Sequence, residues 1–222
     1  MKFTDKLYSE VKEIWNGYLE HPFILGMKDG TLDKELFRDY LVQDYLYLKE
    51  YAKVFCMGII KSKDMEEMRF LYKSISGTME EGASHIRYME ELGITEKEAE
   101  SMKAENENVN YTNYMINVSL QGDIKEIAIA TLVCSWSYGF IGEHLLEEAK
   151  LEGNYYKEWI ALYGDGSYKE FMHSWLKYIN DICKNISKKE ERRYIEIFKQ
   201  CSLYELEFWD MSLRKNKVGA LV

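Results

Sequence analysis

Two carboxylic acids stand where the helical pattern calls for apolar side chains. Asp44 interrupts a stripe with i, i+3, i+4, i+7 spacing that runs from Phe37 to Phe55, and Glu205 interrupts a similar stripe near the C-terminus. A buried carboxylate is costly unless it is paired, hydrogen-bonded or protonated. Either acid alone could bond a tyrosine hydroxyl or a backbone group in the core. Two inward acids together favour a polar pocket, where burial raises the pKa of a carboxyl group and makes it a proton donor near neutral pH.

A cysteine occupies the centre of a third apolar face. Cys134 lies between Ile127 and Ile141 on that face, and Tyr138 follows it by four residues, which places both side chains on the same side of a helix. A lone cysteine in such a place is usually a small core residue. A polar pocket would instead stabilise its thiolate, the nucleophilic form. The other cysteines are interpreted as core residues: Cys56, Cys183 and Cys201.

The histidines do not predict a metal centre. Glu81 and His85 are spaced i, i+4, and Glu143 and His144 are adjacent. Di-iron helical bundles require Glu-x-x-His at i, i+3, contributed twice, together with further glutamates. Neither pair has that spacing, so we do not expect a metal site.

Helical periodicity extends over almost the whole chain. Capping boxes, in which a polar residue and an acid three positions later satisfy free backbone amides, are predicted to start at Thr95, Asp123, Ser167 and Ser187. His21-Pro22-Phe23 is interpreted as a turn that ends the first helix. Connections are short, including one from Gly26 to Asp33. Helices are predicted over residues 4–19, 33–60, 64–92, 95–103, 107–120, 123–150, 154–162, 167–185 and 187–215.

The predicted helices position Asp44, Cys134 and Glu205. Because they cover almost the whole chain, we expect an all-α fold. With no linker or repeat in the sequence, we expect a single domain over residues 1–222, built as an antiparallel helical bundle. The single proline among 222 residues argues against an all-β chain rich in turns. Hydrophobic residues make up 46% of the chain, which is enough for one sizeable core.

Charge and cysteine content narrow the function classes. The net charge is −9, so nucleic acids and anionic membranes are not expected partners. No run of 18 apolar residues predicts a membrane span, and the N-terminus has no apolar signal core. Four cysteines without a CxxC pair are typical of a reducing compartment, so we expect a cytoplasmic protein.

The residues now in view resemble the thiaminase II (TenA) family in its cysteine-containing branch. Matching segments follow the family's order from the N-terminus to about residue 215. They are His21-Pro22-Phe23, Gly30-Thr31-Leu32, Phe37-x-x-Tyr40, Gln43-Asp44-x-x-Tyr47-Leu48, Tyr111-Thr112, Gly122-Asp123-x-x-Glu126-Ile127, Cys134-x-Trp136-x-Tyr138-x-x-Ile141-Gly142, Trp159-Ile160-x-x-Tyr163-Gly164 and Tyr204-Glu205-x-x-Phe208-Trp209.

The resemblance implies a heme-oxygenase-like helical fold, a homotetramer and a hydrolase of thiamin salvage. Such an enzyme converts 4-amino-5-aminomethyl-2-methylpyrimidine to hydroxymethylpyrimidine and ammonia, and it can cleave thiamin to hydroxymethylpyrimidine and thiazole. Aminomethylpyrimidine, its formylated precursor and thiamin share one pyrimidine edge, so the preferred substrate stays open.

The resemblance also assigns roles to residues of this sequence. It implies that Cys134 is the nucleophile, Glu205 the proton donor and Tyr47 a neighbour that raises the nucleophilicity of the thiol. It further implies that the substrate is held by Asp44, Tyr138, Tyr163 and Tyr111.

The sequence departs from the family at two positions. Many relatives have proline directly before the nucleophile and an aromatic residue after it, whereas this chain has Val133 and Ser135. Valine fits a helix interior, so we expect an uninterrupted helix there, with Ser135 facing away from the pocket.

Two other functions remain open at this point. One is an oxidase or a haem-binding protein on the same scaffold, which paired His and Glu ligands or an early proximal histidine would indicate. The other is a non-catalytic regulator, against which the acidic charge and the absence of a basic recognition helix argue.

Overall fold

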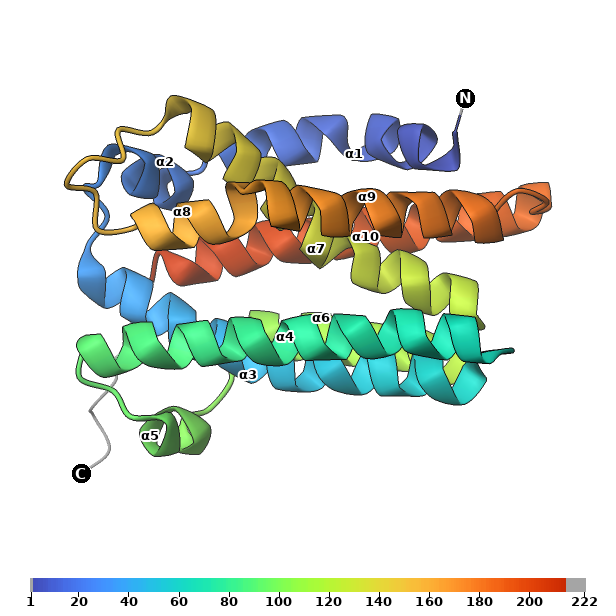
Figure 1. Ribbon diagram of the computed structural model, residues 1–222, viewed down its shortest axis with the longest axis horizontal. Coiled ribbons are helices and arrows are strands. Elements are labelled where there is room, and N and C mark those ends of the chain that lie inside the picture. The colour runs from blue at the N-terminus through green and yellow to red at the C-terminus, as the bar shows by residue number, and fades with distance from the viewer. Residues whose placement is uncertain (1, 215–222) are drawn as a thin grey trace. The chain divides into compact units, whose positions relative to one another are not determined.

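The computed structural model describes residues 2–214, and all regular secondary structure within that range is α-helical. This confirms the predicted all-α class. The helices are α1 (Phe3–Leu19), α2 (Pro22–Asp29), α3 (Lys34–Lys61), α4 (Met65–Glu91), α5 (Glu96–Ser101), α6 (Asn106–Gln121), α7 (Ile124–Glu148), α8 (Lys157–Gly164), α9 (Gly166–Ile182) and α10 (Lys188–Ser212), as Figure 1 shows. The last residue predicted for the final helix, 215, lies outside the described range.

The first helix does end just before His21-Pro22-Phe23, at Leu19, as predicted. However, Pro22 and Phe23 belong to a new helix, α2, which was not predicted. His21 is the N-cap of α2, its ring nitrogen accepts a hydrogen bond from the Phe23 amide at 3.3 Å, and Pro22 is the first helical residue. Proline suits that position because its fixed φ fits a helix and its missing N–H would have no helical partner. The connection expected from Gly26 is correspondingly shorter, since α2 continues to Asp29. Its C-cap is Gly30, where φ is +70°.

Three of the four predicted capping boxes are confirmed, at Thr95, Asp123 and Ser187. The fourth is wrong, because the N-cap of α9 is Asp165, two residues before the predicted cap Ser167. The Asp165 carboxylate accepts hydrogen bonds from the Tyr168 amide at 2.9 Å and from the Ser167 hydroxyl at 2.7 Å. A carboxylate is as good a cap as a serine hydroxyl, so the local sequence offered two possible starts.

The chain divides into two compact units. The first unit comprises the described residues of Met1–Leu32 together with Ala128–Trp209. The second unit comprises Asp33–Ile127 and the described residues that follow Trp209. The predicted single domain stays a prediction.

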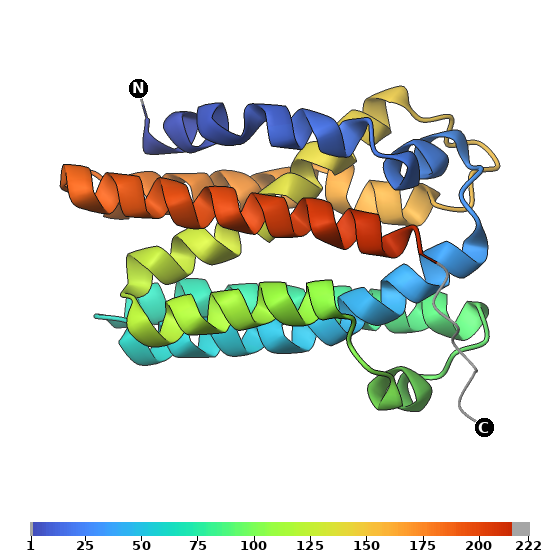
Figure 2. The same ribbon diagram turned by 180° about the vertical axis from the view of Figure 1, so that it is seen from behind.

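The second unit is built around α3. This helix packs along α4 and α6, and the three lie side by side in both views (Figures 1 and 2). Helix α4 turns Leu71, Ser74, Thr78 and His85 inward, with the spacing of one helical face. The same face therefore brings a histidine against α3.

The first unit contains α1, α2, α8, α9 and most of α7 and α10. Helix α1 packs on α9, and it is fixed to α10 by Trp15, whose indole N–H donates to the Ser202 hydroxyl at 3.0 Å. Helices α7 and α8 approach closely at two glycines. A Cβ atom on Gly142 would lie 2.5 Å from the backbone of Tyr163, and one on Gly164 would lie 2.5 Å from the Gly142 carbonyl oxygen.

Helix α7 is long and apolar enough to span a membrane by length and composition. However, 78% of its most hydrophobic window is buried within the protein. Burial of that extent is typical of the central helix of a folded core.

Candidate active site

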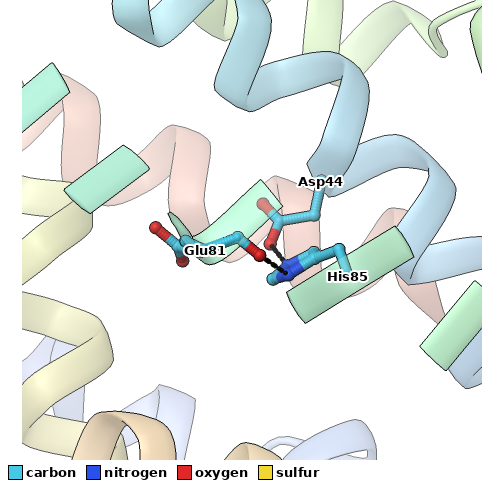
Figure 3. A group of neighbouring side chains, drawn as sticks. All are labelled: Asp44, Glu81 and His85. Atoms are coloured by element: carbon cyan, nitrogen blue, oxygen red, sulfur yellow. Dashed lines mark hydrogen bonds and ion pairs between the residues drawn. The ribbon is translucent and has the colours of Figure 1, made fainter. Parts of the chain in front are cut away.

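Asp44 lies on α3 with only 3% of its surface exposed, as its place in the apolar stripe predicts. Its Oδ2 atom accepts a hydrogen bond from the Tyr40 hydroxyl at 3.1 Å and lies 2.6 Å from Nε2 of His85 on α4. Figure 3 shows the carboxylate and the imidazole pointing toward one another. A buried acid here thus has two polar partners, both on one oxygen.

The hydrogen bond at the other ring nitrogen of His85 indicates how many protons Asp44 and His85 share. Nδ1 lies 2.9 Å from the backbone carbonyl oxygen of Glu81 (Figure 3). A carbonyl oxygen only accepts, so Nδ1 carries a hydrogen and donates it. One further proton then lies between Nε2 and the Asp44 carboxylate.

That further proton is held mainly by the imidazole. Burial lowers the pKa of His85, but the hydrogen bond and charge of Asp44, together with Glu81, outweigh burial and raise that pKa above its ordinary value of 6.5. The neighbouring acids therefore favour the protonated form of the His85 ring.

Asp44, Glu81 and His85 also form a potential set of metal ligands. One ligand atom from each lies within 4.8 Å of the others. In the structure Asp44 and His85 bond directly to each other, so a metal ion would have to replace the shared proton. The absence of a metal from the enzyme stays a prediction.

The two tyrosines predicted for the second unit are brought together. Tyr47 on α3 and Tyr111 on α6 have ring centroids 5.2 Å apart, and Tyr47 also stacks on Tyr51 at 5.4 Å. The Tyr47 hydroxyl lies 3.8 Å from the sulfur of Met115. Both rings are almost fully buried, and Tyr47 follows Asp44 by three residues on α3.

The first unit holds Cys134, Tyr138 and Tyr163. Cys134 and Tyr138 lie one turn apart on α7, which continues without interruption through Val133. The rings of Tyr138 and Tyr163 meet edge to face with centroids 5.0 Å apart. This contact depends on the close approach of α7 and α8, because Gly142 lies against the backbone of Tyr163.

Glu205 on α10 is also buried, with 2% of its surface exposed. Burial and the Glu205 charge together raise the pKa of the Tyr18 hydroxyl and of the Cys201 thiol well above their ordinary values. Glu205 therefore lies in a buried environment and acts on the titration of its neighbours Tyr18 and Cys201.

Each unit thus contributes a distinct group of predicted residues. Asp44, Tyr47 and Tyr111 belong to the second unit, and the remaining four belong to the first: Cys134, Tyr138, Tyr163 and Glu205. Sequence reasoning missed Tyr40 and His85 as partners of Asp44. Tyr40 precedes Asp44 by one helical turn, which is a readable signal, whereas the approach of His85 depends on how α4 packs on α3.

Comparison with known proteins identifies the family of this chain. The profile of the TENA/THI-4/PQQC family matches residues 8–215. The chain belongs to this family. Two relatives from the TENA/THI-4/PQQC family are named aminopyrimidine aminohydrolase. The one from Halalkalibacterium halodurans is 35% identical over 97% of this chain and 97% of its own length. The one from Helicobacter pylori is 36% identical over 96% of this chain and 99% of its own length.

Solved structures of similar proteins have the same fold. A protein from Silicibacter, described as a TenA family transcription regulator, superposes with a TM-score of 0.88 at 28% identity and covers 96% of both chains. A domain from Shewanella denitrificans with a heme oxygenase-like fold superposes with a TM-score of 0.77 at 16% identity, covering 99% of this chain and 98% of its own. The predicted heme-oxygenase-like fold is confirmed.

Proposed function

We propose that this protein is an aminopyrimidine aminohydrolase of thiamin salvage. Its main substrate would be 4-amino-5-aminomethyl-2-methylpyrimidine or the formylated form, and thiamin would be a further substrate. The observation that carries the proposal is the match to two relatives of that name over nearly the full length of both chains. The acid, thiol and tyrosines that such chemistry needs are buried on the helices where the sequence predicts them.

Asp44 is proposed to bind the pyrimidine edge. The exocyclic amine of a 4-aminopyrimidine is a hydrogen-bond donor, and a carboxylate oxygen is a strong acceptor for it. Oδ2 of Asp44 is engaged by Tyr40 and His85, whereas Oδ1 accepts no hydrogen bond from the described residues. That second oxygen is the atom we assign to the substrate amine.

Cys134 and Glu205 are proposed to carry the reaction. The thiolate forms an S–C bond with a ring carbon while Glu205 protonates a ring nitrogen, and aromaticity is lost. Ammonia, or thiazole from thiamin, then leaves the exocyclic methylene, and water adds there. Breaking of the S–C bond restores the ring and the thiolate, and the ring proton returns to Glu205. The balance is one water consumed and one ammonia released.

The tyrosines are proposed to hold and enclose the flat substrate. Tyr138 and Tyr163 would hydrogen-bond it, Tyr111 would cover the ring, and Tyr47 would raise the nucleophilicity of the thiol. No cofactor is required by this chemistry. We further propose that the enzyme is a cytoplasmic homotetramer, and that it binds neither nucleic acid nor membrane.

The direct test is hydrolysis of 4-amino-5-aminomethyl-2-methylpyrimidine beside thiamin, without added metal. We expect ammonia and hydroxymethylpyrimidine from the first substrate, and the two rates rank the substrates. Asp44→Asn is the matched test of the edge contact and should raise KM. Failure of the folded wild-type protein to turn over either compound would refute the proposed activity.

A further inference from the structure

His85 has no role in the proposed chemistry. It is nevertheless hydrogen-bonded to Asp44, the proposed ligand of the substrate. It is 1% exposed, and both of its ring nitrogens are hydrogen-bonded. Burying an imidazole beside a carboxylate is costly unless the two compensate each other. That compensation suggests a function for the pair.

We infer that His85 is a positioning residue for Asp44: it holds Oδ2 and leaves Oδ1 to accept a hydrogen bond from the exocyclic amine of the substrate. This inference rests on the proposed role of Asp44 as the pyrimidine ligand. The 2.6 Å bond between Nε2 and Oδ2 fixes the carboxylate plane, and the Tyr40 hydroxyl at 3.1 Å anchors the same oxygen from α3.

The backbone of α4 makes this arrangement rigid. Because the Glu81 carbonyl holds the Nδ1 hydrogen, the ring cannot flip without losing a hydrogen bond, and Nε2 stays directed at Asp44. A ring pinned at both nitrogens is the usual way in which proteins orient a functional histidine.

Burial gives the arrangement its second effect. A buried carboxylate is costly without polar partners, and His85 and Tyr40 supply them at Oδ2. Oδ1 therefore stays available to accept a hydrogen bond from the substrate amine. The titratable groups that face the pair within the second unit are Tyr40 on α3 and Glu81 on α4. The acids of α5 are engaged elsewhere, with Glu96 and Glu100 both accepting from Tyr45.

Two substitutions separate the effects. In His85→Asn the side-chain amide takes the place of Nδ1, so it can reach the Glu81 carbonyl but not Asp44. In His85→Gln the amide nitrogen takes the place of Nε2, so it donates to Asp44 without charge. His173→Gln, on the exposed face of α9, is the matched control.

The readout is the Kd of the reaction product 4-amino-5-hydroxymethyl-2-methylpyrimidine, measured by calorimetry between pH 6 and 9. We expect His85→Asn to weaken binding about tenfold or more at pH 7, in line with the loss of a charge-assisted hydrogen bond. His85→Gln should bind better than His85→Asn. The wild type and His173→Gln should bind the product equally well. In the two His85 variants kcat should change less than KM.

Asp44→Asn distinguishes the possible failures. If it weakens binding while folded His85→Asn binds like wild type at every pH, His85 is not a positioning residue and the inference is wrong. If Asp44→Asn itself binds like wild type, the proposed role of Asp44 fails. Nitrogen-15 NMR of the wild type provides a test that needs no variant. Two protonated ring nitrogens at pH 6.5 are expected for His85, and a single one would overturn the ion pair.

Discussion

Cys134 is buried on α7, with 8% of its surface exposed, one turn before Tyr138. Replacing its sulfur by oxygen changes the volume little but removes a group that ionises readily near neutral pH. We expect Cys134→Ser to lower kcat by about a thousandfold or more while the variant still binds hydroxymethylpyrimidine. Steady-state assays and calorimetry measure the two quantities.

The exposed Cys56 on α3 provides the control for this change. Cys56→Ser makes the same chemical replacement outside the proposed site, and its kcat should match that of the wild type. Turnover by Cys134→Ser at the wild-type rate would rule out covalent catalysis by this thiol.

The Asp44–His85 pair also makes stability depend on pH. The pKa of His85 is raised in the folded protein above its ordinary value of 6.5, so the folded state binds the proton more tightly than the unfolded state. The resulting stabilisation is complete below about pH 6.5 and is lost as pH rises through the higher folded pKa. The Tm difference between wild type and His85→Gln should therefore shrink between pH 6.5 and 9. A constant difference over that range would show that the imidazole does not carry this proton.

For single residues, the sequence predicted which acids are buried better than it predicted their hydrogen-bond partners. Asp44 and Glu205 were recognisable because each interrupts an apolar helical stripe, and both are buried. Tyr40 follows from the same helical spacing. His85 does not, because 41 residues separate it from Asp44 and only the packing of α4 on α3 brings them together. The catalytic and binding roles themselves stay predictions.

At the level of the helices, the close approach of α7 and α8 leaves no room for a larger side chain at Gly142. An added methyl group on Gly142 would lie 2.5 Å from the carbonyl carbon of Tyr163, so the backbones would have to separate. We expect Gly142→Ala to reduce the free energy of unfolding by about 1–3 kcal/mol, which is typical of overpacking. It should also raise KM, because Tyr163 would move away from Tyr138. Denaturant unfolding and steady-state kinetics measure these effects.

Gly77 on α4 is the matched control for this substitution. No atom lies within 4 Å of its added Cβ, so Gly77→Ala should stabilise the protein by up to about 1 kcal/mol through helix propensity. Equal effects of the two alanine substitutions would mean that the close approach of α7 and α8 is unimportant.

Most helices could be predicted because their period and caps agree. The error at α2 arose because proline can begin a helix as well as end one, and His21 is an uncommon N-cap. The error at α9 arose because Asp165 and Ser167 are both good caps. Local sequence gives such alternatives similar free energies, and tertiary packing decides between them.

The proposed homotetramer is a statement about the whole molecule. Three large apolar side chains on α4, Met65, Tyr72 and Met79, are more than half exposed and are spaced by seven residues. Exposed apolar surface of this kind is typical of protein interfaces. Light scattering should give a mass near four times 26.4 kDa. Because the expected interface is apolar, that mass should not change when added salt screens the surface charges. A mass of one chain at micromolar concentration would contradict the proposal.

The unequal exposure of the four thiols has a practical consequence for chemical modification. Cys56 is exposed, whereas Cys134, Cys183 and Cys201 are buried, and the raised pKa of Cys201 keeps its thiol protonated. An alkylating reagent applied to the native protein will therefore attach first at Cys56. Inactivation rates report on Cys134 only in a Cys56→Ser background, and in the wild type Cys56 provides a natural point of attachment for a maleimide fluorophore.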